Sequence, residues 1–181
     1  MILNPCHPKD LTLLRQISLE TYVETFEAAN TPANMQSYLQ QAFNTQRLSD
    51  ELAEPHSQFF LAYKHDQVTG YFKINNGSAQ TEFNDPNALE LERIYVLRRY
   101  QGQGLGQQLL NAVINIANEQ QKQWLFLGVW EHNQKALAFY KRNGFYRIGQ
   151  HIFNMGDDPQ TDYLLRKDLK KDNQSVQERY E

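Results

Sequence analysis

Several features that would point to particular classes of protein are missing from the 181-residue sequence. Its single cysteine, Cys6, excludes an internal disulfide framework and supplies no pair of thiolates for a metal ion. No apolar run approaches the about 20 residues of a membrane-spanning helix. The first residues, MILNPCHPKDL, lack the basic start and apolar core of a signal peptide. We therefore expect a cytoplasmic protein that does not interact with membranes.

An excess of basic charge is also missing. The sequence holds 18 Lys and Arg against 21 Asp and Glu, a net charge of −3, and no basic stripe with interleaved aromatic residues. This composition argues against nucleic acid as a partner. The five histidines show no spacing typical of metal ligands, so no metal site is predicted.

The length and the 40% hydrophobic content are those of one ordinary domain with a sizeable core. Periodicities of three and four residues predict helices over 11–30, 35–43, 46–53, 105–117 and 134–142. Aromatic and β-branched runs predict strands over 57–64, 68–75, 89–96, 124–129, 145–153 and 161–169. The mixture predicts a single α/β or α+β domain over residues 1–169, followed by a polar tail over residues 170–181.

The segment RRYQGQGLGQ, residues 98–107, follows a predicted strand and leads into a predicted helix. It is not a Walker loop, because Gly106 is followed by two glutamines instead of Lys and Ser or Thr. It also departs from the dinucleotide-binding fingerprint, which would have glycine in place of Gln107. The remaining pattern fits backbone amides that curl around a diphosphate at the positive end of the following helix. A glycine-rich turn without a ligand is the alternative.

Together with a second segment, this loop resembles the GCN5-related N-acetyltransferase (GNAT) superfamily. Residues 101–106, QGQGLG, match its motif A, which is Gln or Arg, two residues, Gly, one residue, and Gly or Ala. Residues 133–145, NQKALAFYKRNGF, resemble its motif B, N-x-x-A-x-x-F-Y-x-x-x-G-F. Over residues 11–169 the chain is similar to the bacterial spermine/spermidine acetyltransferases of the PaiA type.

This resemblance implies a mixed, mostly antiparallel central sheet flanked by helices, which splays open beyond the strand that leads into the glycine loop. It also implies acetyl-CoA as the cosubstrate, bound in the splay. The backbone of Ile94, Tyr95 and Val96 would hold the pantetheine arm, and Asn133 would hydrogen-bond to it. The pyrophosphate would bind to the amides of Gln101, Gly102, Gln103, Gly104, Leu105 and Gly106. The resemblance is also compatible with a homodimer formed through an exposed sheet edge.

Transfer of an acetyl group from a thioester to an amine needs a neutral amine, stabilisation of an oxyanion and a proton for the departing thiolate. No nucleophilic side chain is required. The resemblance places Tyr140 opposite the thioester sulfur of CoA, where its phenol would act as the general acid.

Two glutamates of the strand 89–96 are candidates for the general base. Alternation puts Glu90 and Glu92 on one face of the strand. The other face would hold Leu89, Leu91 and Arg93. We expect Glu92 to act as the base, with Glu90 as the second choice. A solvated strand face, or ion pairs to Arg93 or Lys73, is the competing interpretation.

The expected acceptor is a primary amine, and the closer resemblance implies a polyamine such as spermidine or spermine. Two alternatives stay open: acetylation of another amine (an amino acid, an antibiotic, a protein lysine or N-terminus), or a CoA-binding sensor or interaction module without turnover. Candidate charge partners for a cationic amine are Glu24, Glu27, Glu131, Asp157 and Asp158. Candidate aromatic walls are Tyr22, Phe26 and Phe83, and His132 is a candidate proton relay.

Overall fold

A computed structural model describes residues 1–169, and the polar tail predicted over residues 170–181 lies outside the described residues. Seven strands form one sheet: β1 (Ile2–Pro5), β2 (Ser57–Lys64), β3 (Gln67–Asn75), β4 (Ala88–Val96), β5 (Trp124–Trp130), β6 (Tyr146–Met155) and β7 (Asp158–Asp168). Their order is β1-β2-β3-β4-β5-β7-β6, and every neighbouring pair is antiparallel except β4 and β5. The predicted mixed, mostly antiparallel sheet is confirmed.

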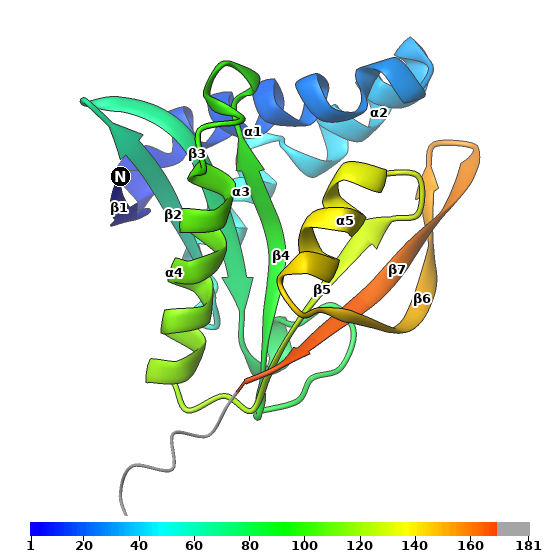
Figure 1. The fold of residues 1–181 in the computed structure, drawn as a ribbon. Helices are drawn as coiled ribbons and strands as arrows, with labels where there is room; N and C mark the ends of the chain where they lie inside the picture. The colour runs from blue at the N-terminus through cyan, green and yellow to red at the C-terminus, as the bar shows by residue number, and fades with distance from the viewer. Residues whose placement is uncertain (170–181) are drawn as a thin grey trace, which may run out of the picture.

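The helices of residues 1–169 cover both faces of this sheet (Figure 1): α1 (Leu11–Phe26), α2 (Pro32–Ala42), α3 (Thr45–Ala53), α4 (Leu105–Glu119) and α5 (Gln134–Arg142). One hydrophobic cluster, which includes Leu109 and Val113, joins α4 and α5 to one face. A second cluster, which includes Leu14 and Leu48, joins α1, α2 and α3 to the other face. None of these helices is long and apolar enough to cross a membrane.

The first two helices are bounded differently from their predicted ranges. α1 ends at Phe26 and is followed by a short 3-10 turn, after which Asn30 and Thr31 are extended. Proline disfavours the helical conformation in the residue before it, but it suits the first position of a helix. α2 therefore begins at Pro32, three residues earlier than predicted, and the Thr31 hydroxyl caps it by accepting a hydrogen bond from the Asn34 amide (3.2 Å).

A β-bulge interrupts β4 at Glu92. The ladder pairs Arg93 with Lys73 of β3 but Leu91 with Ile74, which leaves Glu92 as an extra residue. The bulge shifts the alternation of β4 by one position, so Arg93 lies on the same face as Glu92 and pairs with it. The prediction that Arg93 shares the opposite face with its neighbouring leucines is therefore wrong, because a strict period of two holds only where a strand has no bulge.

β4 and β5 separate soon after they meet. Their parallel ladder begins where Ala88 pairs with Trp124 and ends where Glu90 pairs with Phe126. Beyond that point β4 stays paired with β3, and β5 stays paired with β7 along its whole length. The two strands therefore diverge toward the glycine loop (Figure 1). This confirms the predicted splay of the sheet.

Gly70 lies where β3 pairs with the end of β4. A Cβ at this position would overlap the carbonyl oxygen of Tyr95 and lie 3.2 Å from the Cα atom of Val96, and both belong to a paired backbone. We expect Gly70→Ala to lower the free energy of unfolding by about 2 kcal/mol. Gly106→Ala is the matched control, because a Cβ there meets nothing within 4 Å. Urea unfolding measures both variants, and equal stability would contradict the overlap.

Candidate active site

The splay leaves the facing edges of two strands without a ladder between them. Residues 91–96 of β4 and 127–130 of β5 lie beyond the last parallel pair. The predicted pantetheine-binding residues Ile94, Tyr95 and Val96 lie on this stretch and pair with β3 on their other side. The ring of Phe26, from α1, lies 6.5 Å from that of Tyr95 and 6.2 Å from that of Trp130. Phe26 therefore bridges the opening on one face of the sheet.

The glycine loop connects the end of β4 to the start of α4. Gly102 and Gly104 have φ angles of 75° and 77°, a left-handed conformation that favours glycine, and a Cβ at either would meet nothing within 4 Å. The amide of Gln101 donates to the Arg98 carbonyl (3.1 Å), so the amides available to a ligand begin after Gln101. The first N–H groups of α4 have no partners inside the helix. The loop and helix start are therefore suited to bind an anion.

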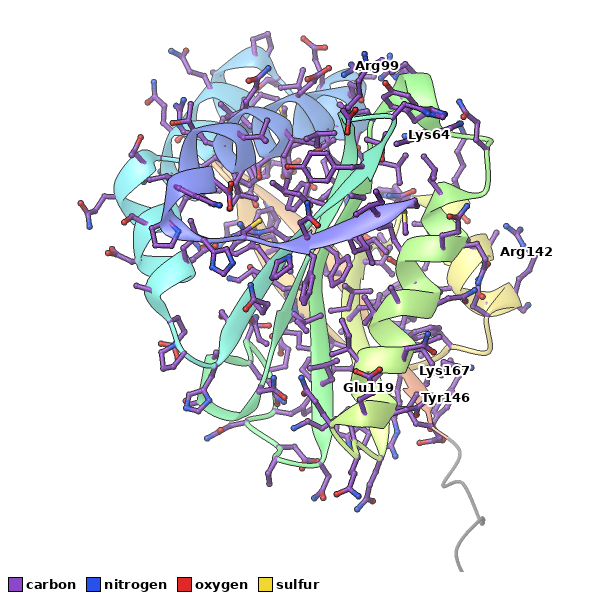
Figure 2. All side chains as sticks on the ribbon, turned by 90° about the vertical axis from the view of Figure 1, so that its left-hand side faces the viewer. Lys64, Arg99, Glu119, Arg142, Tyr146 and Lys167 are labelled. Carbon is purple, nitrogen blue, oxygen red and sulfur yellow. The ribbon has the colours of Figure 1, made fainter. Side chains whose placement is uncertain are left out.

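Basic side chains surround the same end of α4. Figure 2 shows Lys64 and Arg99 near the N-terminal end of α4 and Arg142 beside α4 on the neighbouring helix α5. Lys64 Nζ donates a hydrogen bond to the side chain of Gln103 (2.9 Å), and Arg99 pairs with Glu20 (2.6 Å). These cations add to the positive end of the helix dipole and favour a phosphate there.

Asn133 stands between β5 and α5, as predicted. Its side-chain oxygen accepts a hydrogen bond from the Ala136 amide (3.1 Å) and so caps α5. The helix ends before Gly144, whose φ of 80° closes its last turn. Because only the oxygen of the Asn133 carboxamide is used in the cap, its NH₂ group can still donate to a ligand.

Tyr140 lies on the inward face of α5. Its side chain is buried, its ring lies 5.4 Å from that of Phe145, and its hydroxyl forms no hydrogen bond within residues 1–169. Burial raises the pKa of Tyr140, so the phenol stays protonated at neutral pH. Burial chiefly raises the pKa of Tyr95 as well, and the nearby Tyr140 contributes. Tyr140 belongs to the hydrophobic cluster that also contains Leu91 of β4 and Leu127 of β5, so it lies beside both strands of the splay.

Glu92 belongs to a network of buried ion pairs. One of its oxygens contacts Lys73 Nζ and Asn75 Nδ2 (2.6 Å each), and the other contacts Arg93 (3.1 Å). Glu51 of α3 also pairs with Lys73 (3.2 Å) and Arg93 (3.0 Å), so two carboxylates face two cations. Burial opposes ionisation of Glu92, but Arg93 and Lys73 outweigh it and hold its pKa below the ordinary value. These contacts are the ion pairs to Arg93 and Lys73 that the alternative to a general base predicts.

Glu90 is more deeply buried, at 3% exposure. It accepts hydrogen bonds from the backbone amide of Thr81 (2.9 Å), from the Thr81 hydroxyl and from Asn75 Nδ2 (2.9 Å). Burial raises its pKa in spite of these hydrogen bonds. Glu90 therefore anchors the loop that precedes β4 and shares Asn75 with Glu92.

Of the three predicted aromatic walls, only Phe26 bridges the splay. Tyr22 is buried and stacks on Tyr38 (4.5 Å between centroids), and Phe83 packs against Phe126 of β5 (4.9 Å).

Of the predicted charge partners for a cationic amine, Glu27 and Asp158 are exposed. Four predicted charge partners already accept hydrogen bonds within the chain, which come from Arg98 for Glu24, Tyr163 for Glu131, Asn34 for Asp157 and Gln160 for Asp158. In the described part of the chain, no group of three His, Cys, Asp or Glu is placed to hold a metal.

Sequence reasoning did not identify a cluster made by Glu82, His151 and Asp162. His151 is 2.8 Å from Glu82 and 3.7 Å from Asp162, and the three residues come from a loop, from β6 and from β7. The separation of Glu82 from the other two along the chain gives no local signal. Only the pairing of β6 with β7, and the path of the loop before β4, bring them together.

Removal of Lys73 tests the energetics of the Glu92 network. Lys73→Met leaves Glu92 with one fewer cation, and we expect the free energy of unfolding at pH 7 to fall by about 3 kcal/mol. A carboxylate with a lowered pKa stabilises the fold above its ordinary pKa of 4.5 and loses that contribution as the pH falls through the lowered value. The deficit of the variant should therefore shrink below about pH 4. Arg47→Met is the control, because Arg47 pairs with the same Glu51 from a 52% exposed position; an equal loss in this variant would refute the assignment.

Comparison with proteins of known sequence agrees with this geometry. The acetyltransferase (GNAT) family model matches residues 14–145. An uncharacterized N-acetyltransferase of Lactobacillus delbrueckii subsp. lactis is 43% identical over 161 residues, which cover 89% of this chain and 93% of that protein. A spermine/spermidine N(1)-acetyltransferase of Bacillus subtilis (strain 168) is 36% identical over 95 residues, which cover 52% of this chain and 62% of the relative.

Solved structures agree in fold. The PaiA N-acetyltransferase from Thermoplasma acidophilum, in complex with coenzyme A, superposes with a TM-score of 0.75 at 19% identity, covering 93% of this chain and 99% of that one. At this identity the likeness shows the fold. The family match and the Lactobacillus relative, together with the splayed sheet, show that the chain belongs to the GNAT family of N-acetyltransferases.

Proposed function

We propose that this N-acetyltransferase uses acetyl-CoA to acetylate a primary amine and that the acceptor is a polyamine such as spermidine or spermine. The observation that carries the proposal is the edge of β4 that β5 leaves unpaired, which leads into the glycine loop and shares a hydrophobic cluster with Tyr140. The Bacillus subtilis relative supports the polyamine, and the PaiA neighbour, whose structure contains coenzyme A, supports the cosubstrate.

The residues around the splay fit acetyl-CoA, which supplies the thioester. The backbone of Ile94, Tyr95 and Val96 would hold the pantetheine arm as an added strand does. The side-chain NH₂ of Asn133 would donate to the arm from the other side. The pyrophosphate would bind to the loop amides from Gly102 to Gly106, close to Lys64 and Arg99. In this arrangement the Gln101 side chain supports the loop, because it donates to the Val96 carbonyl (3.0 Å).

Tyr140 would provide the proton for the departing thiolate. Burial keeps its phenol protonated, and its hydroxyl has no competing hydrogen bond within residues 1–169. Packing against Phe139 and Phe145 holds the ring in place. These three properties suit a general acid that donates once the C–S bond begins to break.

Tyr140→Phe removes the hydroxyl and keeps the ring. We expect turnover to fall about 100-fold or more, while the Kd for CoA stays within twofold, because the hydroxyl acts on the leaving group. Free-thiol release measures turnover, and titration with CoA measures binding. Tyr146→Phe is the control, since Figure 2 shows Tyr146 far from the N-terminal end of α4. Turnover of Tyr140→Phe within twofold of the wild type would disprove the acid role.

Glu92 is the carboxylate that we propose for the acceptor side. Glu92 lies two residues beyond Glu90, the last residue of β4 that pairs with β5. Its lowered pKa keeps it ionised at neutral pH. It would stabilise the positive charge that develops on the attacking nitrogen. A primary amine with a pKa near ~10 is only about one part in a thousand neutral at pH 7, which costs about 4 kcal/mol, so a proton acceptor is needed in addition.

Glu92→Gln tests this role. We expect kcat/KM to fall about tenfold or more, with an unchanged Kd for CoA and an unchanged shape of the pH profile, because the carboxylate does not titrate near neutral pH. Lys73→Met is the matched variant, because it disturbs the same network and keeps the carboxylate. If the two variants lose activity to the same extent, Glu92 acts only through the network.

The acceptor is identified by a panel of amines. Thiol release from acetyl-CoA is followed with spermidine, spermine, amino acids, an aminoglycoside and lysine peptides. Release with polyamines supports the proposal, and release only with another amine overturns its acceptor while keeping the enzyme. Binding of acetyl-CoA without release in any reaction would favour a CoA-sensing module.

The homodimer stays a proposal of the same kind. β6 forms one edge of the sheet, and Ile148 and Ile152 on this strand are 40% and 60% exposed. An exposed edge with apolar side chains favours pairing with another chain. These features support a dimer formed through β6.

A further inference from the structure

The cluster of Glu82, His151 and Asp162 lies over the part of β5 that borders the splay. Asp162 pairs directly with His151 in the β6–β7 ladder and with Trp130 in the β5–β7 ladder. The three side chains are 23%, 33% and 24% exposed, so they are neither core nor free surface. A Cβ at Gly128 of β5 would lie 3.8 Å from both His151 Cε1 and Asp162 Oδ2. The absent side chain therefore leaves space for the imidazole over β5.

The position of Gly128 relates this cluster to Glu92. The last pair of the β4–β5 ladder joins Glu90 to Phe126. Gly128 lies two residues beyond this pair on β5, and Glu92 lies two residues beyond it on β4. Phe126 and Gly128 share a face of β5. The loop before β4 lies over that face, because Thr81 binds Glu90 and Phe83 packs on Phe126. The imidazole and Glu92 thus flank the start of the splay on one face.

The loop that carries Glu82 is held on both sides of this residue. The preceding residue, Thr81, donates its amide to Glu90 (2.9 Å), and the following residue, Phe83, packs on Trp124 and Phe126. The side chain of Gln80 donates to two backbone carbonyls in the loop and the start of β4 (3.0 Å each). Glu82 is therefore fixed where it can orient the imidazole.

We propose that His151, oriented by Glu82, is the proton acceptor for the amine substrate. This inference rests on the proposed function. His151 Nδ1 lies 2.8 Å from a carboxylate oxygen of Glu82, an ion-pair contact that favours a proton on Nδ1 and a lone pair on Nε2. Nε2 is 3.7 Å from Asp162, beyond hydrogen-bond distance, so the lone pair is available to the substrate. Glu92, by contrast, already has donors on both oxygens.

The proton and electron pairs balance along this path. The ammonium N–H bond breaks, its electron pair stays on nitrogen, and the proton moves to Nε2 of His151. The nitrogen lone pair then forms the C–N bond to the acetyl carbon as the C–S bond breaks. The thiolate sulfur takes the proton of Tyr140, which is replaced by the second proton that leaves nitrogen. His151 returns its proton to water, and carboxylates on both sides stabilise the imidazolium in between.

Two carboxylates stand beside the imidazole of His151. Within residues 1–169, the charged groups that face the imidazole are Glu82 from the loop and Asp162 from β7, and β5 presents only Gly128. On α1, Tyr22 has a pKa raised by burial first and by Asp162 to a smaller degree, so this phenol is neutral near pH 7. The pH dependence of kcat/KM should therefore report the imidazole and the amine.

The test is the pH profile of His151→Gln with acetyl-CoA and the amine that the panel shows to be active. The wild type can bind the ammonium form and should reach a plateau above about pH 7. The variant needs an amine that is already neutral, so its kcat/KM should keep rising toward the amine pKa near ~10. We expect a loss of about 100-fold at pH 7 that shrinks to about threefold at pH 10. Recovery at high pH would also show that the variant folds.

Two further variants separate catalysis from structure. His56→Gln is the matched control, because His56 is exposed and lies in the turn that precedes β2. It should keep the wild-type profile. Glu82→Gln should move the rise of the profile to lower pH, because an imidazole without its carboxylate is a weaker base. A structural role of Glu82 would lower activity equally at every pH.

If the kcat/KM profile of His151→Gln keeps the plateau of the wild type, and its value at pH 7 stays within threefold of the wild-type value, the role of His151 is overturned and the proposed function stays intact. A wild-type enzyme that releases no thiol with any amine would instead overturn the proposed function, and this inference with it. Restoration of His151→Ala by added imidazole, without any effect of imidazole on Tyr140→Phe, would support the inference independently of the pH profile.

Discussion

The separation of β4 from β5 is the constraint on which the rest of the structure depends. A strand edge inside a sheet has backbone donors and acceptors that need partners. Here the ladder ends at Glu90 and Phe126, and the bulge at Glu92 bends β4 at this point. The ion pairs of Glu51 join α3 to β3 and β4 beside the bulge, so buried contacts hold the bend in place.

Backbone groups and side chains differ in what they offer a ligand at the splay. Peptide groups of β4 and of the glycine loop suit a long ligand that contains a diphosphate, because they offer donors without bulky side chains. The side chains that we propose for catalysis lie on both faces, with Tyr140 on the face of α4 and α5 and Glu92 and His151 on the other. A thioester held in the gap would thus meet its acid from one face and the amine from the opposite face.

Polar contacts connect the two sides of the acceptor face. Asn75 links Glu92 to Glu90, and Glu90 holds Thr81, which is followed in the chain by the residue that orients His151. The carboxylates on this face therefore have different tasks. Glu90 is buried and positions a loop, Glu92 is ionised within an ion-pair network, and Glu82 holds an imidazole.

Much of the fold was predictable because it depends on local chemistry. The five helices and six of the seven strands follow from periodicity, and the end of α5 follows from Asn143 and Gly144. Helix boundaries near Pro32 were wrong by a few residues, since the restrictions of proline act on its neighbour as well. The side of β4 on which Arg93 lies was also wrong, because a bulge is decided by the partner strand and leaves no mark in the periodicity.

By itself, the sequence determined the glycine loop, the Asn133 cap, the position of Tyr140 on its helix and the family to which the chain belongs. These depend on residues that are close together along the chain. Only the tertiary structure decided what surrounds Glu92 and that Glu82, Gly128, His151 and Asp162 meet. The physical reason is that the protonation and orientation of a side chain depend on neighbours in space, and strand register, not sequence spacing, brings those neighbours together.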